Sequence, residues 1–544
     1  MIKTLTGKLK NSRPSNSINS AALIIATASI LSRLLGLVRD RILASQFGAG
    51  DTLDIYYAAF RVPDLIYNLL ILGALSAAFI PVFTGLLARE EKDEAWKLAN
   101  GLMTFAIITL VILTATLAIL TPWLMKLITP GFSGEKLASV VKLTRIMFLS
   151  PIFLGVSGIF GGILNSFKRF LIYSIAPLFY NLGIIVGALF FVPMLGVIGL
   201  AWGVILGAFL HMIIQYPAAR VTGFSFSPLF DLKNIHLRKV LRLMVPRTLG
   251  LAVTQVNLLI VTILASTLSA GSLAIFNFAN NLQSVPLGVL SVPFILAVFP
   301  TLSHLAAKEN WDDFIENFSK TFRQTLFFII PASVLILVLR AQIVRIVLGS
   351  GKFDWEDTIL TFQALEIFSV SLFAQCLIPL LARSFYALHN TRTPFFTGLA
   401  SEVVNLGLAI FLSRKFGILG LVWAFSAANV VNMVLLFQIL RKKLGKLDES
   451  KIFSSVAKIV FAALSAGLAA QFAKYAISLK MNLDTFGGIF AQLGAGGVAG
   501  ILVYLIFSQY LKLEEFETVK RLLKFKALRA QPTIPEDPTE ASGI

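Results

Sequence analysis

The sequence predicts an all-α integral membrane protein with about fourteen transmembrane helices, arranged as two parallel six-helix lobes around a central cavity plus two C-terminal helices. Three observations predict this class. The 544-residue chain is 57% hydrophobic and 14% charged, with a mean hydropathy of +0.82, which is far from the composition of a soluble protein. Apolar stretches long enough to cross a bilayer recur along the chain. Short words of the first half also recur in the second half.

A transmembrane helix needs about 20 mainly apolar residues, because each residue adds about 1.5 Å along the helix axis. Stretches of this kind lie between charged or Pro- and Gly-rich segments. The predicted spans are 21–47, 54–87, 97–127, 140–160, 172–192, 197–217, 241–267, 273–298, 323–347, 361–386, 395–413, 418–440, 453–476 and 486–510.

The distribution of Lys and Arg predicts the orientation of these spans. The loops on the side of the amino terminus hold about 27 of these residues, against about 7 on the other side, which predicts that both termini are cytoplasmic. Residues 1–20 are polar and charges interrupt the first span, so it differs from a cleaved signal peptide. The net charge of +19 therefore reflects topology and contact with anionic membrane lipids, and nucleic acid is not an expected partner.

An internal match relates the two halves of the chain. Ile42–Ser45 recurs as Ile263–Ser266, and Ala49-Gly50 as Ala270-Gly271, at an offset of about 221 residues; chance recurrence of short apolar words is the alternative. Span 1 then matches span 7, which preserves orientation and predicts parallel lobes with a substrate site between them. The expected organisation is an N-terminal tail (1–20), an N-lobe with helices 1–6 (21–220), a C-lobe with helices 7–12 (221–440), helices 13–14 (441–511) and a C-terminal tail (512–544).

The first predicted span carries charges that need a reason. Arg33, Gly36, Arg39 and Asp40 fall on one side of the helix, whereas Arg41 points away from them. A central arginine costs about 2.5–3.5 kcal/mol on insertion scales, so such residues usually face water or a polar partner. This stripe indicates an anionic ligand, with Asp40 pairing an arginine when the site is empty; a purely structural ion pair is the alternative.

Two further polar stripes follow. The second span carries Asp54, Tyr57, Arg61, Asp64 and Asn68 along one narrow face, and Pro63 predicts a bend beside Arg61. Asp54 has an alternative role as a simple helix start, because it follows Gly48-Ala-Gly50. In the second half, Asn277, Asn280, Asn281 and Ser284 form a neutral stripe directly before Pro286. These amides suit either sugar hydroxyls or pairing between helices.

Enzymatic chemistry finds little support in the sequence. The four histidines, His211, His236, His304 and His389, lack paired metal-ligand spacing, and no nucleotide-binding loop is present. Glu402 with Asn405 offers two oxygen ligands, too few for a cation site. We therefore expect no catalysis, no metal and no cofactor, and transport that is not driven by nucleotide hydrolysis.

The chain resembles the MurJ (MviN) family of lipid II flippases, in the multidrug/oligosaccharidyl-lipid/polysaccharide exporter (MOP) superfamily. The resemblance covers nearly the whole chain. The residues that carry it are Ser32-Arg-x-x-Gly-x-x-Arg-Asp40, Phe47-Gly-Ala-Gly50 followed by Asp54, Ala59-Phe-Arg-Val-Pro63, Gly73 to Pro81, Pro130-Gly-Phe132, Leu164-Asn165 with Arg169-Phe170, Pro286-Leu-Gly-Val-Leu290, Pro300-Thr-Leu-Ser303, Gly351-Lys-Phe353, and Phe385-Tyr386 with Thr391-Arg-Thr-Pro394.

The resemblance implies a flippase that moves lipid II, the undecaprenyl-pyrophosphate-linked peptidoglycan precursor, from the inner to the outer leaflet of the bacterial cytoplasmic membrane by alternating access. It implies a central cationic cavity, a groove for the polyprenyl tail on helices 13 and 14, contact of Arg33 and Arg39 with the pyrophosphate, and a role for Asp54 in the cycle. We expect Arg61 to join these two arginines in binding the diphosphate. The residues expected to line the cavity or to bend are Asp40, Asp54, Asp64, Asn68, Asn277, Asn281, Pro63 and Pro286.

The chain departs from the family pattern at several positions. Many relatives carry arginines where Tyr67, Asn68 and Asn281 stand here. A sodium site of some relatives uses an aspartate on helix 7, where this chain offers only Gln255 and Asn257, so that site is not transferred.

Other functions remain as alternatives. The same fold exports other polyprenyl-linked glycans, of O-antigen or teichoic type. A membrane scaffold that recruits cell-wall synthesis proteins, with purely structural arginines, belongs to a different class, and those proteins are the candidate protein partners. A carrier of cationic drugs is disfavoured, because it would prefer an acidic cavity.

Overall fold

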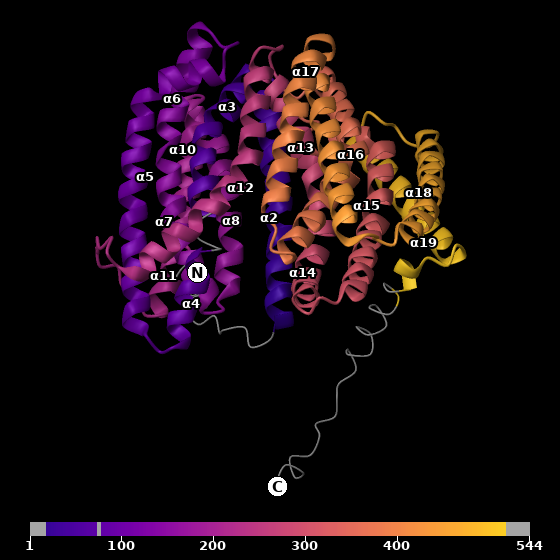
Figure 1. Ribbon diagram of the computed structural model, residues 1–544. Helices are drawn as coiled ribbons and strands as arrows, with labels where there is room; N and C mark the ends of the chain where they lie inside the picture. The colour runs from indigo at the N-terminus through magenta and orange to yellow at the C-terminus, as the bar shows by residue number, and fades with distance from the viewer. Residues whose placement is uncertain (1–17, 73–77, 518–519, 521–544) are drawn as a thin grey trace, which may run out of the picture. The chain divides into compact units, whose positions relative to one another are not determined.

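The computed structural model describes residues 18–72, 78–517 and 520, and within them the chain is helical, with no strand (Figure 1). Most of the two predicted terminal tails lies outside the described residues. The elements of the first half are α2 (Ile18–Phe47), α3 (Asp51–Ile66), η1 (Tyr67–Leu72), α4 (Ile80–Ala88), α5 (Lys92–Ile128), α6 (Gly134–Met147), α7 (Leu149–Ser166), α8 (Phe170–Val186), η3 (Gly187–Phe191), α9 (Val192–Leu195), α10 (Ile198–Ile213) and α11 (Tyr216–Val221). Those of the second half are α12 (Ile235–Ser266), α13 (Ser272–Pro286), η4 (Leu287–Ser291), α14 (Val292–Ala307), α15 (Trp311–Val347), α16 (Trp355–Ala387), α17 (Arg392–Leu444), α18 (Glu449–Ser478) and α19 (Phe486–Tyr510).

Nine helical stretches within the described residues are long and apolar enough to cross a membrane. The all-helical, multi-pass class is therefore confirmed, whereas the number of about fourteen spans is not. Part of the difference lies in α17, which is counted once over 53 residues although it contains the predicted spans 395–413 and 418–440. These two spans meet at Gly417, where φ is +57° and the helical backbone is interrupted.

The chain divides into two compact units. The first unit comprises Met1–Val285, Ile343–Ser371 and Thr391–Asn432. Within it, α10 packs against α6, α7 and α8, and α2 packs against α8 (Figure 1). Helices α8 and α10 approach each other closely at Gly183, because this residue has no side chain. A Cβ there would lie 2.2 Å from the backbone nitrogen of Gly207.

The second unit comprises Pro286–Gln342, Leu372–Asn390 and Met433–Ile544. Helices α18 and α19 run side by side in it, drawn in yellow shades in Figure 1. They meet α15 through glycines: a Cβ on Gly467 would lie 2.7 Å from Val334, and one on Gly500 would lie 2.5 Å from Leu335. This contact is tight along the apolar part of α15.

The internal match seen in the sequence coincides with a repeat of helix boundaries. Helix α3 begins at Asp51 and α13 at Ser272, which are the residues that follow the matched glycines Gly50 and Gly271. Each helix runs into a π-helical turn, η1 after α3 and η4 after α13. Matching words therefore begin matching helix–π-turn units, which supports duplication; the boundaries of the two six-helix lobes stay a prediction.

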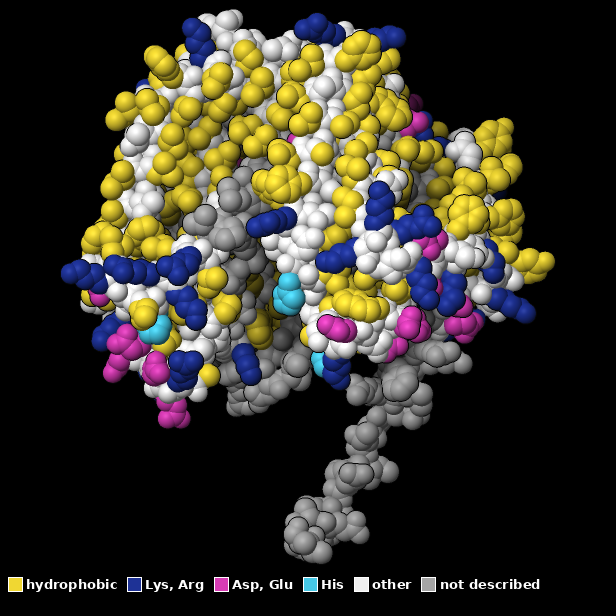
Figure 2. Space-filling view, viewed as in Figure 1, with side chains coloured by type: hydrophobic (Ala, Val, Ile, Leu, Met, Phe, Trp, Pro, Cys, Tyr) yellow, Lys and Arg dark blue, Asp and Glu magenta, His cyan; other side chains and the backbone are white. Residues whose placement is uncertain are grey.

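The surface has the character expected of a membrane protein. Over the first-unit helices at the left of Figure 2, hydrophobic side chains cover the upper part and a row of Lys and Arg side chains lies below them. Large apolar residues such as Trp123 and Leu127 are 85% and 71% exposed. Side chains of this kind are stable at such exposure when they face lipid.

Candidate functional site

The centre of the candidate site is a set of polar side chains that we call the arginine cluster: Arg33, Arg39, Asp40, Arg61, Asn277 and Asn281. Helix α2 supplies the first three members, α3 supplies Arg61 and α13 supplies the two amides. All of them lie in the first unit. The structure therefore brings together residues that are more than two hundred positions apart in the chain.

Asp40 is the most enclosed member, with 2% of its surface exposed. Its Oδ1 accepts hydrogen bonds from Nε and Nη2 of Arg39 at 3.0 and 2.8 Å, and its Oδ2 accepts one from Nδ2 of Asn281 at 2.8 Å. Nη1 of Arg39 donates to Oδ1 of Asn181 on α8 at 3.0 Å. The Arg39–Asp40 pair thus ties α2 to both α8 and α13.

The other two arginines donate to neutral acceptors. Nη1 of Arg33 donates to the backbone carbonyl of Ser284 at 3.0 Å. Arg61 donates from Nε to Oγ1 of Thr262 at 2.7 Å and from Nη2 to Oδ1 of Asn277 at 3.0 Å. Among the described residues neither arginine forms an ion pair within 4.0 Å, although Asp64 attracts Arg61 from one turn along α3. Asp64 therefore partly balances the charge of Arg61, whereas Arg33 contacts only a neutral acceptor in the described part of the chain.

The remaining predicted site residues lie near the π-helical turns. Pro63 is buried in the last turn of α3, and Asn68 in η1 donates to the backbone carbonyl of Asp64 at 2.9 Å. Pro286 is the last residue of α13 and is followed directly by η4. Both prolines therefore precede an irregular turn, as expected where a proline removes an intrahelical hydrogen bond.

Sequence reasoning missed two partners of the cluster. Asn181 and Thr262 are buried at 8% and 0% exposure, and they hold Arg39 and Arg61 respectively. The available signal was weak, because neither residue belongs to one of the polar stripes and neither is charged. A search for isolated intramembrane amides would have found Asn181.

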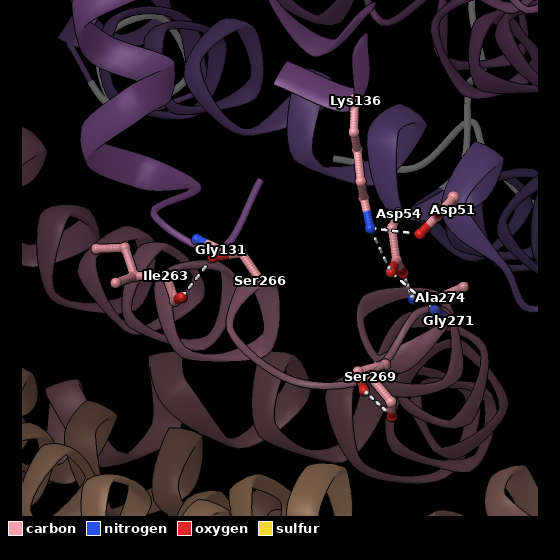
Figure 3. A network of polar contacts seen from close by, with 10 residues as sticks. Asp51, Asp54, Gly131, Lys136, Ile263, Ser266, Ser269, Gly271 and Ala274 are labelled. Carbon is pink, nitrogen blue, oxygen red and sulfur yellow. Dashed lines mark hydrogen bonds and ion pairs between the residues drawn. The ribbon is translucent and has the colours of Figure 1, made fainter. Parts of the chain in front are cut away.

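Asp54 lies at a second polar centre, shown in Figure 3. Its Oδ2 accepts a hydrogen bond from the backbone nitrogen of Gly271 at 2.8 Å, and its Oδ1 accepts one from that of Ala274 at 3.0 Å. Gly271 directly precedes α13 and Ala274 lies in its first turn, where backbone nitrogens have no intrahelical partner and a negative charge is favoured. Lys136 on α6 adds its Nζ 3.7 Å from Oδ2 of Asp54 and pairs with Asp51.

This geometry shows which helix the Asp54 carboxylate caps, whereas the role of Asp54 in the transport cycle stays a prediction. The residue that precedes α3 is Gly50, and Asp54 is the fourth residue of the helix. Its carboxylate is 2% exposed and caps α13 instead of its own helix. We call this contact the Asp54 cap; it joins the start of α3 to the start of α13.

Backbone contacts reinforce the same end of the first unit. Gly271 has φ of +85°, and a Cβ there would lie 1.8 Å from the carbonyl oxygen of Ala49. The backbone nitrogen of Ala49 donates to Oδ2 of Asp357 at 2.8 Å, and that of Lys352 donates to the carbonyl of Ser45 at 2.8 Å. The end of α2 is therefore held both by the α12–α13 connection and by the α15–α16 connection.

The close approach at Gly271 gives a direct prediction. Gly271→Ala introduces a left-handed backbone strain of about 1–2 kcal/mol together with the clash at Ala49. We expect the melting temperature of the purified protein to fall by several degrees. Gly497→Ala on α19 is the matched control, because a Cβ there meets nothing within 4 Å. Equal melting temperatures for the two variants would contradict the close contact.

The carboxylate of Glu402 has amide partners. Nδ2 of Asn257 donates to its two oxygens at 2.9 and 2.7 Å, and Nδ2 of Asn405 lies 3.3 Å from Oε2. The residues that the structure describes contain no group of three His, Cys, Asp or Glu side chains suited to a metal ion. Amide groups therefore donate hydrogen bonds to this carboxylate, at the position where the sequence had raised the question of a bound cation.

Comparison with solved structures defines the class of protein. The fold matches a structure titled "Lipid II flippase MurJ, inward closed conformation" with a TM-score of 0.74 and 24% identity, over 90% of this chain and 98% of that chain. It also matches an inward-facing multidrug resistance MATE family transporter of the MOP superfamily, with a TM-score of 0.67 and 17% identity, over 77% of this chain and 96% of that chain. The protein thus has the fold of the MOP superfamily of membrane transporters.

Sequence comparison defines the family more narrowly. The model of the family "Lipid II flippase MurJ" matches residues 43–483. The probable lipid II flippase MurJ of Thermotoga maritima is 30% identical over 504 residues, which cover 92% of this chain and 98% of that protein. The lipid II flippase MurJ of Burkholderia cenocepacia is 29% identical over 431 residues, 78% of this chain and 84% of that protein. The chain belongs to the lipid II flippase MurJ family.

Proposed function

We propose that this protein is a lipid II flippase, which translocates the polyprenyl-linked peptidoglycan precursor across the bacterial cytoplasmic membrane for cell wall synthesis. Membership of the MurJ family carries the proposal. The arginine cluster supplies the chemistry, because a diphosphate needs positively charged, multidentate donors. Movement from the inner to the outer leaflet, with both termini cytoplasmic, is part of the proposal.

Arg33 and Arg61 bind the diphosphate first in this mechanism. Their present acceptors are a carbonyl, a hydroxyl and an amide, all of them neutral. Hydrogen bonds to ionised oxygens are about twice as strong as those between neutral groups, so a diphosphate displaces these acceptors favourably. Arg39 stays oriented by Asp40 and turns its remaining donors toward the same anion.

Translocation requires the Asp54 cap to open. The cap and the contacts of Ser45 and Ala49 close one end of the first unit. We assign bending to the segments at Pro63 and Pro286, each of which precedes a π-helical turn.

Complementation tests the function. Bacteria depleted of their own flippase should recover growth and expose lipid II on the outer leaflet when they produce this chain, and the variant Arg33→Ala should fail at equal abundance. Arg145→Ala is the matched control, because Arg145 also donates to a backbone carbonyl, that of Ala118, but is exposed and outside the cluster. Rescue by Arg33→Ala as complete as by Arg145→Ala would exclude diphosphate binding by Arg33. Failure of a well-inserted parent in several hosts would instead favour another polyprenyl-linked glycan.

A further inference from the structure

The second unit contains a polar cluster that the transport mechanism does not use. We call it the lateral cluster: Arg340 and Gln342 on α15, Lys474 on α18 and Gln492 on α19. Nζ of Lys474 donates to the carbonyl of Val338 at 3.0 Å, and Nη1 of Arg340 donates to that of Leu337 at 2.6 Å. Nε2 of Gln342 donates to Oε1 of Gln492 at 2.7 Å, and Nε2 of Gln492 donates to the carbonyl of Lys474 at 3.0 Å.

The cluster lies where the tight apolar packing of α15 ends. Three glycines of α18 and α19 pack against apolar side chains of α15: Gly467 against Val334, Gly500 against Leu335 and Gly496 against Leu339. The polar residues of the cluster follow within one further turn of α15. Lys474 is four residues from the end of α18 and Arg340 is seven from the end of α15, which corresponds to about 6 and 10 Å along the helix axes at 1.5 Å per residue. The cluster therefore lies near the ends of these helices, where a lipid headgroup is closer than at the middle of a span.

Two positive charges of the lateral cluster lie near each other, and an anion would be attracted to both. Arg340 is near enough to Lys474 for the two positive charges to repel each other. Arg340 and Lys474 are both half-buried, so water screens their repulsion only in part. Among the described residues Lys474 has no carboxylate within 4.0 Å, and its hydrogen-bond acceptor is a backbone carbonyl.

One buried acceptor in the cluster lacks a hydrogen bond. Oε1 of Gln342 is enclosed without a partner, whereas the amide nitrogen of the same side chain is bound to Gln492. An amide oxygen left in this way costs about 1–3 kcal/mol unless a donor reaches it. A ligand that carries both a phosphate and a hydroxyl or ammonium group would satisfy the cations and this acceptor together.

We propose that the lateral cluster binds the phosphate-bearing headgroup of a membrane lipid, held between α15 and the α18–α19 pair. With both termini cytoplasmic, the cluster lies in the outer leaflet. The shared chemistry is a phosphate ester attached to a hydrophobic anchor, which two sources supply: an anionic glycerophospholipid such as phosphatidylglycerol, or a polyprenyl phosphate. The proposal does not depend on lipid II transport.

A structural role is the competing explanation, because Lys474, Gln342 and Gln492 already link three helices through hydrogen bonds. The two roles differ in one measurable property. Helix pairing affects stability in any lipid, whereas a headgroup site distinguishes anionic from zwitterionic lipids.

Binding to the purified full-length protein tests the proposal. Native mass spectrometry would measure retention of phosphatidylglycerol and of phosphatidylcholine by the parent, by Arg340→Gln with Lys474→Gln, and by Lys458→Gln. Lys458 is the matched control, since it is an exposed lysine on the same helix α18. We expect the double variant to lose roughly thirtyfold in affinity for phosphatidylglycerol, at about fivefold for each charge. Lys458→Gln should retain the parent's preference.

One further variant and a competition measurement complete the test. Lys474→Arg keeps the charge and should keep the preference for phosphatidylglycerol, even if it lowers stability. Competition with undecaprenyl phosphate identifies the source, because preferential displacement of phosphatidylglycerol assigns the site to the polyprenyl carrier and its absence assigns it to phospholipid. Equal retention of phosphatidylglycerol and phosphatidylcholine by the parent would overturn the proposal. Equal affinities of the double variant and Lys458→Gln would overturn it as well.

Discussion

The double substitution Arg39→Gln with Asp40→Asn is expected to abolish transport while the protein still inserts at normal abundance. It removes both charges of an enclosed pair together, so no unpaired charge is left behind. The new amides can still form hydrogen bonds toward Asn181 and Asn281. Arg39→Ala alone would leave the carboxylate of Asp40 without its charged partner, at a cost of about 3–5 kcal/mol, and would confuse misfolding with lost function.

The size of the expected effect follows from the loss of a charged donor. Hydrogen bonds to charged groups contribute about 1.5–3 kcal/mol each, so diphosphate affinity should fall at least about tenfold and up to a hundredfold or more. The resulting loss of transport is measured by the growth of flippase-depleted cells and by the amount of lipid II exposed on their outer leaflet. Glu94→Gln with Lys97→Gln, which neutralises an exposed ion pair on α5, is the matched control. Full activity of the Arg39 and Asp40 double variant would show that the two charges are not needed for transport. The pair would then have only a structural role, as the scaffold alternative predicts.

Asp54→Ala is expected to shift the protein away from the closed arrangement that the cap holds. The substitution removes two charged hydrogen bonds to the start of α13, worth about 3 kcal/mol together at the lower end of their range. A change of this size alters the ratio of closed to open states by about 150-fold. Transport should then fail, because a carrier that cannot close one side cannot alternate.

Thiol labelling measures this shift. Ser284→Cys places a reporter beside Arg33 without removing the carbonyl that accepts its hydrogen bond, in a background where the single native cysteine, the buried Cys376, is replaced by Ala. A membrane-impermeant reagent added outside should label the reporter much faster when Asp54→Ala is present. Asp51→Ala is the control, since Asp51 shares the contact with Lys136 but is exposed and makes no bond to α13. Equal labelling of the two variants would show that the cap does not hold the closed state.

Helix positions followed well from the sequence where local signals mark them. The predicted span 486–510 coincides with α19, because Thr485 caps Gly488 at its start. Boundaries were less accurate where such signals are weak. Helix α6 begins at Gly134, six residues before the predicted span 140–160, and a break before Leu149 separates it from α7. By contrast, the predicted break between the spans 395–413 and 418–440 coincides with Gly417, where the helical backbone of α17 is interrupted.

The sequence by itself determined the class of this protein and predicted a set of site residues. The length of the apolar stretches, the distribution of charge and the periodic polar stripes are properties of single helices. They could therefore be recognised without knowing which helices pack together. The tertiary structure alone decided the partners: Asn281 and Asn181 for the Arg39–Asp40 pair, Thr262 and Asn277 for Arg61, and the start of α13 for Asp54. These hydrogen bonds join residues 142 to 241 positions apart, so they depend on the rotation and register of whole helices, which packing of the bundle fixes.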